Sequence, residues 1–313
     1  MSKTNVYTLV ATALLGVLLY VVLQFARKVP TQPITTNIMT ETMGLPVGGR
    51  SDLLAILEAR GIDAQRAIAE SIDWRQARGF LDSDRVFGVA DDGAPARLYE
   101  ILEIATLESM SESGDLAATQ ALAARKLLED PFASLALYTT AANQGSVFAM
   151  LQIGALRETF ADIALDDTFR ANPAYLRKLS ELRNENSRGS LKMEAFAYVG
   201  AAIRDGGIAI VDQDLLDWIQ QMAQELPPAE LAPACELSAN LFLKISAARR
   251  RRGLSQITTE PPPVFFGITN LQEQLPCQST GHSIIWLLDL SRCSVIQVDH
   301  ADGETPDLYI CQN

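Results

Sequence analysis

The chain has 313 residues, of which 48% are hydrophobic and 20% charged, and this composition excludes disordered and fibrous proteins. Its length allows about two domains and a sizeable core. The formal net charge is −12, and residues 1–40 hold three basic side chains and no acid, so the rest is more acidic still. Such a body is unsuited to general binding of nucleic-acid phosphates. Only two histidines, His282 and His300, are available for imidazole chemistry.

An apolar run over residues 6–26 follows a short N-terminal tail, residues 1–5, and contains Gln24 as its one strongly polar side chain. About 20 such residues span a ~30 Å hydrocarbon core as a helix. A cleaved signal peptide is the alternative, but its apolar region is shorter and ends in small residues. We therefore predict a transmembrane helix over 6–26, followed by a flexible linker over 27–50 that is rich in Pro, Thr and Gly.

The flanking charges barely decide the orientation of this anchor, since Lys3 lies before it and Arg27 and Lys28 lie after it. A short tail, a single anchor and an acidic body are typical of an exported body. All four cysteines lie in that body, and an even number is compatible with an oxidising compartment. The expected location is the inner (cytoplasmic) membrane, single-pass, with the body in the periplasm.

Residues 51–255 contain helix start and stop signals and no strand pattern. Capping side chains or first-turn prolines mark the starts, and glycines mark the ends. The expected starts are Ser51, Asp63, Asp130, Asn172, Ser190, Asp214 and Pro233; the expected ends include Gly61, Gly79, Gly145, Gly206 and Gly253. Helices of this length with short connections predict a mainly α domain of stacked helix hairpins.

Two internal similarities support repetition within this domain. Gly114-Asp115-x-x-Ala118 returns 31 residues later as Gly145-Ser146-x-x-Ala149. A second pattern, Tyr-x-x-Ala-Ala followed by glycine, occurs at Tyr138 and again at Tyr198. Small residues at such positions allow two helices to approach closely.

The segment from Asp130 to Gly154, with Tyr138, Gly145 and Ala149 in place, resembles a Sel1-like repeat, a relative of the tetratricopeptide repeat. One unit matches, from about residue 114 to 156. The resemblance implies an irregular α/α solenoid that holds another protein. At its groove we expect a partner to contact four residues: Tyr138, Gln144, Tyr198 and Arg204.

The chain departs from the family pattern in two places. Residues 128–131 replace the usual glycine-rich turn, and residues 157–190 form an apparent insertion. An irregular helical bundle with the same small-residue packing is therefore the alternative to a regular solenoid.

Three consecutive prolines, Pro261–Pro263, close the helical part because proline cannot continue a helix. Beyond them, short runs rich in β-branched and aromatic residues occur over residues 283–288, 293–298 and 307–311. These runs predict a small antiparallel β meander in a C-terminal subdomain, residues 256–313.

The cysteines are candidates for two disulfides. In a meander the start of the second strand lies beside the end of the third, which brings Cys293 near Cys311 and leaves Cys277 for Cys235. Four cysteines allow three connectivities, so the other two pairings stay open. A zinc site that combines two cysteines with His282 and His300 is a further alternative, although the spacing does not match common zinc sites.

A dense basic run, Arg249–Arg252, ends the last predicted helix. Cations at a helix C-terminus complement the helix dipole, which is one explanation for the run. Binding to lipid headgroups or to an acidic partner is the other.

The sequence lacks the phosphate-binding, dinucleotide-binding, nucleophile-elbow and zinc-protease motifs. We therefore expect a scaffold and no enzyme, with no cofactor, no metal, no nucleic-acid partner and no identified small-molecule substrate. Its expected partners are a protein or peptide of the cell envelope and, through the N-terminal helix, the membrane. The alternatives are an envelope enzyme acting on cell-wall polymer through paired carboxylates and a metal- or ligand-sensing membrane protein.

Overall fold

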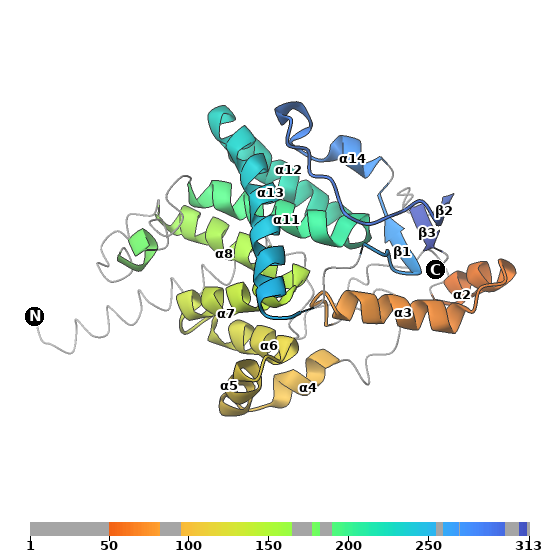
Figure 1. Cartoon of the computed structure of the whole chain (residues 1–313), viewed down its shortest axis with the longest axis horizontal. Helices are drawn as coiled ribbons and strands as arrows, with labels where there is room; N and C mark the ends of the chain where they lie inside the picture. Colours follow the sequence, from red (N-terminus) through yellow and green to blue (C-terminus); the bar gives the residue numbers. More distant parts are fainter. Residues whose placement is uncertain are drawn as a thin grey trace, which may run out of the picture.

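The computed structural model describes residues 50–81, 95–164, 177–181, 190–254, 259–268, 270–297 and 307–311. Within them the chain is mainly helical and carries one small antiparallel sheet (Figure 1). The predicted anchor, most of the linker, Asn172 and His300 lie outside the described residues. No helix in the described ranges is both long and apolar enough to cross a membrane.

The helices and strands follow in chain order. The longer helices are α2 (Arg50–Ala59), α3 (Ala64–Gln76), α4 (Pro95–Ile101), α5 (Ile104–Glu112), α6 (Leu116–Lys126), α7 (Pro131–Gln144), α8 (Val147–Ala164), α11 (Leu191–Gly206), α12 (Gln213–Glu225) and α13 (Pro228–Arg251). The short helices are η3 (Gly207–Ile210), α14 (Leu271–Gln274) and η4 (Gln278–Thr280), and the strands are β1 (Val264–Gly267), β2 (Cys293–Gln297) and β3 (Asp307–Cys311).

Six helices, α5, α6, α7, α8, α11 and α13, pack each against the next, and we call them the helical stack (Figure 1). Residues 157–164 of the predicted insertion continue α8. The main core fills the middle of the stack, where Tyr138, Met150, Ile153, Phe196 and Ile203 are 2% exposed or less. Stacking of successive helices thus buries the apolar face that each helix alone would leave in water.

The 31-residue similarity corresponds to repeated local geometry. Gly114 and Gly145 both adopt positive φ, at +92° and +107°, and each ends one helix before the next begins. Asp115 Oδ1 then accepts a hydrogen bond from the Ala118 N–H at 2.8 Å, and Ser146 Oγ accepts one from the Ala149 N–H at 2.8 Å. The same turn and the same N-cap therefore connect α5 to α6 and α7 to α8.

Glycines bring α8, α11 and α13 close together. A Cβ built on Gly154 of α8 would lie 2.6 Å from Val199 Cγ2 of α11, and one on Gly200 of α11 would lie 2.7 Å from Ser238 Oγ of α13. Both distances are shorter than real Cβ contacts, so a larger residue at either position would displace the neighbouring side chain.

The first helix pair and the sheet share a second core. Leu57 and Ile68 of α2 and α3 pack with Val264, Leu308 and Ile310 of β1 and β3. Main-chain contacts reinforce this packing: the Val264 N–H donates to Ser71 Oγ at 3.0 Å, and Trp74 Nε1 donates to the Glu260 carbonyl at 2.8 Å. The helix pair that opens the described chain therefore rests on its C-terminal sheet (Figure 1).

The sheet is antiparallel and three-stranded, but its composition and strand order differ from the predicted meander. β3 is central, between β1 and β2, and the predicted strand at 283–288 is absent from it. Instead the segment follows the end of α11, where the Leu287 N–H donates to the Arg204 carbonyl and the Arg204 guanidinium donates to the Ser283 carbonyl. These bonds to a helix end take the place of a sheet ladder.

The two predicted disulfides are confirmed. Cys293 and Cys311 face each other across β2 and β3, and Cys235 of α13 bonds to Cys277. Three predicted helix starts are displaced. Ser51 lies inside α2, which begins at Arg50. Asp212, not Asp214, caps α12 through the Leu215 N–H at 2.8 Å, and α13 begins at Pro228 and includes Pro233 in its interior.

Candidate functional site

The four residues predicted at a partner-binding groove contact other parts of the same chain. Tyr138 is 2% exposed and lies in the main core, where burial raises its pKa. Tyr198 lies under the Arg157 guanidinium, 5.3 Å from its ring centre. The Gln144 carbonyl accepts a hydrogen bond from Arg249, and Arg204 holds the segment at 283–287.

The position of α13 explains this placement. α13 packs against both α7 and α11, and it crosses them in the view of Figure 1. Tyr138 and Gln144 belong to α7, and Tyr198 and Arg204 to α11. The structure thus does not gather the four side chains on one exposed surface, and their role as partner contacts stays a prediction.

A buried charged cluster joins the end of α11 to α13. Asp205 is 1% exposed, and neither of its carboxylate oxygens has a hydrogen-bond partner among the described residues. Burial raises the pKa of Asp205 to about 6, although the positive charges of Arg78 and Arg249 act in the opposite direction. Arg78 also stacks on the Trp74 ring, 3.5 Å from its centre, and its carbonyl accepts hydrogen bonds from the first two N–H groups of α8.

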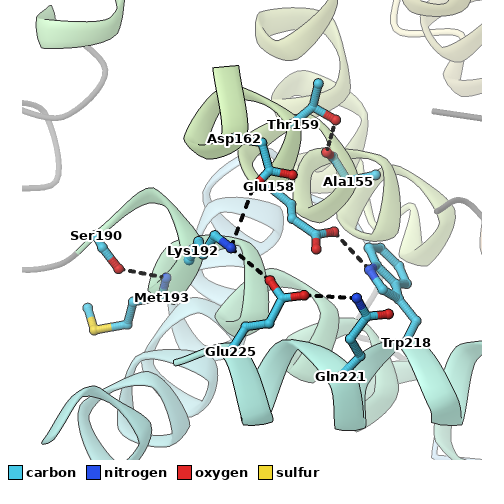
Figure 2. A network of polar contacts seen from close by, with 10 residues as sticks. All are labelled: Ala155, Glu158, Thr159, Asp162, Ser190, Lys192, Met193, Trp218, Gln221 and Glu225. Carbon is cyan, nitrogen blue, oxygen red and sulfur yellow. Dashed lines mark hydrogen bonds and ion pairs between the residues drawn. The ribbon is translucent and has the colours of Figure 1, made fainter. Parts of the chain in front are cut away.

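A second polar network fastens α8, α11 and α12 (Figure 2). Trp218 Nε1 of α12 donates to Glu158 Oε2 of α8 at 2.9 Å, and Glu158 is only 2% exposed. Lys192 of α11 lies between Asp162 and Glu225, 3.4 Å and 2.7 Å from their oxygens. These contacts connect three helices to one another, and Glu158 stays buried among them.

Two further acids, Glu194 and Asp212, have structural partners. Glu194 forms an ion pair with Arg157, and burial raises the pKa of Glu194 despite that positive charge. Burial likewise raises the pKa of Asp212, which caps α12. These contacts do not support a particular catalytic reaction over the scaffold interpretation. The disulfides occupy all four cysteines, so no thiolate remains for the zinc alternative. The described residues contain no cluster of three metal-binding side chains.

Three of the large apolar residues that are exposed in the described part of the chain lie together where α4 meets α5, at one end of the helical stack. Leu98, Ile101 and Ile104 are 57%, 79% and 41% exposed, and they follow one another along α4 and the start of α5. Exposed Glu100 and Glu103 alternate with them. We call these five residues the apolar end.

The apolar end is held against the C-terminal end of α6. Arg125 donates to the Glu100 carbonyl, and Lys126 pairs with Glu108 at 2.6 Å. Sequence reasoning missed this surface because the break between α4 and α5, at residues 102–103, interrupts the helical period, so the period does not show which side of residues 98–104 is exposed.

Comparisons with known proteins give no information about this site. No protein-family model, no curated protein and no solved structure matches the chain. The exposed apolar end and the buried contacts around α13 are therefore the observations on which a functional proposal has to rest.

Proposed function

We propose that this protein is a single-pass, membrane-anchored scaffold with its helical body on the exported side. The body would dock a partner protein of the cell envelope at the apolar end of its stack. The Sel1-like resemblance around Tyr138 and Gly145 supports a binding role, since repeat stacks of this kind present rigid recognition surfaces at small entropic cost. The two disulfides support an oxidising compartment.

The observation that carries the proposal is the exposure of Leu98, Ile101 and Ile104. The terminal unit of a helical stack ordinarily turns a polar face to solvent, because an apolar terminal face invites association. Here the terminal face is apolar and has acidic neighbours, Glu100 and Glu103. A fitting partner carries an apolar patch with basic residues at its rim.

A photo-crosslinking amino acid at Ile101, in the full chain in intact cells, tests the proposal. We expect one reproducible covalent adduct with an envelope protein, and no such adduct when the crosslinker replaces Glu112, an exposed residue at the other end of α5. The partner found in this way is then purified for binding measurements.

The binding measurement compares the full chain with the double variant Leu98→Gln/Ile104→Gln. We expect at least a tenfold weaker affinity, since two apolar anchors leave the interface. Ile285→Gln, at a residue 58% exposed elsewhere on the chain, is the matched control and should bind like the wild type. Equal affinity of all three proteins would contradict the proposal.

A further inference from the structure

The end of α13 carries a concentration of positive charge that is unusual for this acidic chain. Between Leu237 and Thr259 the sequence holds Lys244 and the run Arg249–Arg252, and no acid. The formal charge of the whole chain is −12, so the charge of this stretch is opposite in sign to that of the chain.

The five cations divide between two environments. Arg249 is turned toward the chain, where its guanidinium donates to the Gln144 carbonyl at the end of α7. The side chains of Lys244, Arg250, Arg251 and Arg252 are exposed and form no hydrogen bond or ion pair with the side chains or main chain of the described residues. The dipole of α13 favours the arginines of its last turn, but it does not account for Lys244, which lies further from the helix end.

Exposed leucines lie among these cations. Leu243 is 61% exposed and Leu254 is 39% exposed. Leu243, Arg250 and Arg251 are seven and eight residues apart, a spacing that places them on one side of the helix. We call Leu243, Lys244, Arg250–Arg252 and Leu254 the basic face.

We propose that the basic face docks on a bilayer surface that carries anionic headgroups. The cations would meet lipid phosphates, and the two leucines would enter the boundary between headgroups and acyl chains, as in interfacial helices. We favour a bilayer over an acidic protein because the proposed anchor keeps the body beside a membrane, where anionic headgroups are present at high local concentration.

This inference rests on the anchor in the proposed function, which keeps the body near a membrane. Residues 27–49 between the predicted anchor and α2 reach at most roughly 80 Å when fully extended. As a flexible coil, a linker of this length has an end-to-end distance of roughly 25 to 30 Å. Docking is then an intramolecular event, for which weak electrostatic attraction suffices.

Trypsin cleavage after Arg250–Arg252 tests the docking. The full chain is reconstituted into phosphatidylcholine vesicles with or without 30% phosphatidylglycerol, and trypsin is added outside. Peptides are quantified by mass spectrometry, with cleavage after exposed Arg60 as the internal reference. We expect the phosphatidylglycerol vesicles to slow cleavage at Arg250–Arg252 at least fivefold relative to Arg60, and 0.5 M salt to abolish the protection. Alkaline extraction of the same vesicles tests the anchor separately.

The variant Leu243→Gln/Lys244→Glu changes the basic face without removing a cleavage site in the arginine run. It should be cleaved on anionic vesicles as fast as on neutral ones, while Arg292→Glu, an exposed charge reversal just before β2, should retain the protection. Equal cleavage on both vesicle types would overturn the proposal and favour an acidic protein as the partner. Equal protection of Arg60 would also overturn it, because shielding would then not be specific to this face.

If alkaline extraction removes the chain, the anchor fails while the docking is still measurable. The unanchored chain should then float with anionic vesicles at low salt, and the Leu243→Gln/Lys244→Glu variant should not. Absence of flotation for the unchanged chain would refute the docking itself.

Discussion

Arg249, near the end of α13, donates a hydrogen bond to the main-chain carbonyl of Gln144, the last residue of α7. The last carbonyls of a helix have no partner within the helix and carry partial negative charge. A guanidinium from a distant helix satisfies one of them here, across 105 residues of sequence. The contact fixes the end of α13 against the end of α7, where Gln144 lies.

Substitution of Gly145 by alanine tests this contact. A Cβ at Gly145 would overlap the Arg249 guanidinium, and φ at this position is +107°. Gly114→Ala is the matched control, because φ is +92° there and nothing lies within 4 Å of the added atom. Gly114→Ala should cost about 1 to 2 kcal/mol from backbone strain alone. Gly145→Ala should cost clearly more by urea unfolding, and equal costs would contradict the role given to Arg249.

The pH dependence of stability tests the burial of Asp205. Its pKa is about 6 in the folded chain, above the ordinary value near 4 of an unfolded aspartate. Between these values the folded state binds more protons than the unfolded state, so the free energy of unfolding falls as pH rises from about 4 to 6. The full difference is on the order of 3 kcal/mol.

Asp205→Asn cannot ionise and should lack this decline in urea unfolding measured from pH 4 to 7.5. Asp73→Asn, at an exposed residue of α3, should keep the wild-type profile. An Asp205→Asn profile that falls as steeply as that of the wild type would show that another group is responsible.

Trp218→Phe should lower the free energy of unfolding by about 1 to 3 kcal/mol, since buried Glu158 loses a hydrogen-bond donor. A double-mutant cycle with Glu158→Gln separates this bond from the packing of the indole ring. A coupling energy indistinguishable from zero would mean that the bond in Figure 2 contributes nothing to stability.

The two disulfides should differ in their contribution to stability. Cys235–Cys277 spans 42 residues and Cys293–Cys311 spans 18. Loop-closure entropy predicts about 4 and about 3 kcal/mol, respectively. Paired replacement by alanine, Cys235→Ala/Cys277→Ala or Cys293→Ala/Cys311→Ala, followed by guanidinium unfolding, measures both values. A larger loss for the second pair would contradict the entropic argument.

Labelling with a membrane-impermeant maleimide tests the compartment. With the body exported and all four cysteines paired, intact cells should show labelling only after a reductant is added. Lysed cells are the control. Silence in intact cells under both conditions, with labelling on lysis in the absence of reductant, would place the body in the cytoplasm and exclude the disulfides there.

Local signals in the sequence predicted much of the helical part. Asp63, Asp130 and Ser190 cap α3, α7 and α11 as expected. In each case the side-chain oxygen accepts a hydrogen bond from an N–H group of the first turn, which has no partner within the helix. The cysteine pairing was also predictable, since the hairpin of β2 and β3 alone brings Cys293 beside Cys311.

The features that sequence reasoning missed depend on distant contacts. The segment at 283–288 has strand-like composition, but it forms hydrogen bonds with the end of α11 instead of with a strand. Likewise, no local pattern reveals that the charges of Arg78 and Arg249 act on Asp205, because the three residues come from three separate parts of the chain. Sequence periodicity indicates which face of a helix is buried but not which element covers it, and for this reason the packing of α13 against α7 at Gln144 could not be predicted.

The central position of β3 imposes an order on biogenesis. The apolar side of α2 and α3, including Leu57 and Ile68, packs on Leu308 and Ile310 of that strand. Some 240 residues separate the two surfaces, and a ribosome adds them in roughly 10 to 50 s at ordinary elongation rates. During that interval the apolar side of α2 and α3 is exposed on the nascent chain, because β3, which covers it, has not yet been synthesised. A chaperone that shields α2 and α3 until translation reaches β3 would raise the yield of native protein more than one acting on the self-contained α5–α8 hairpins.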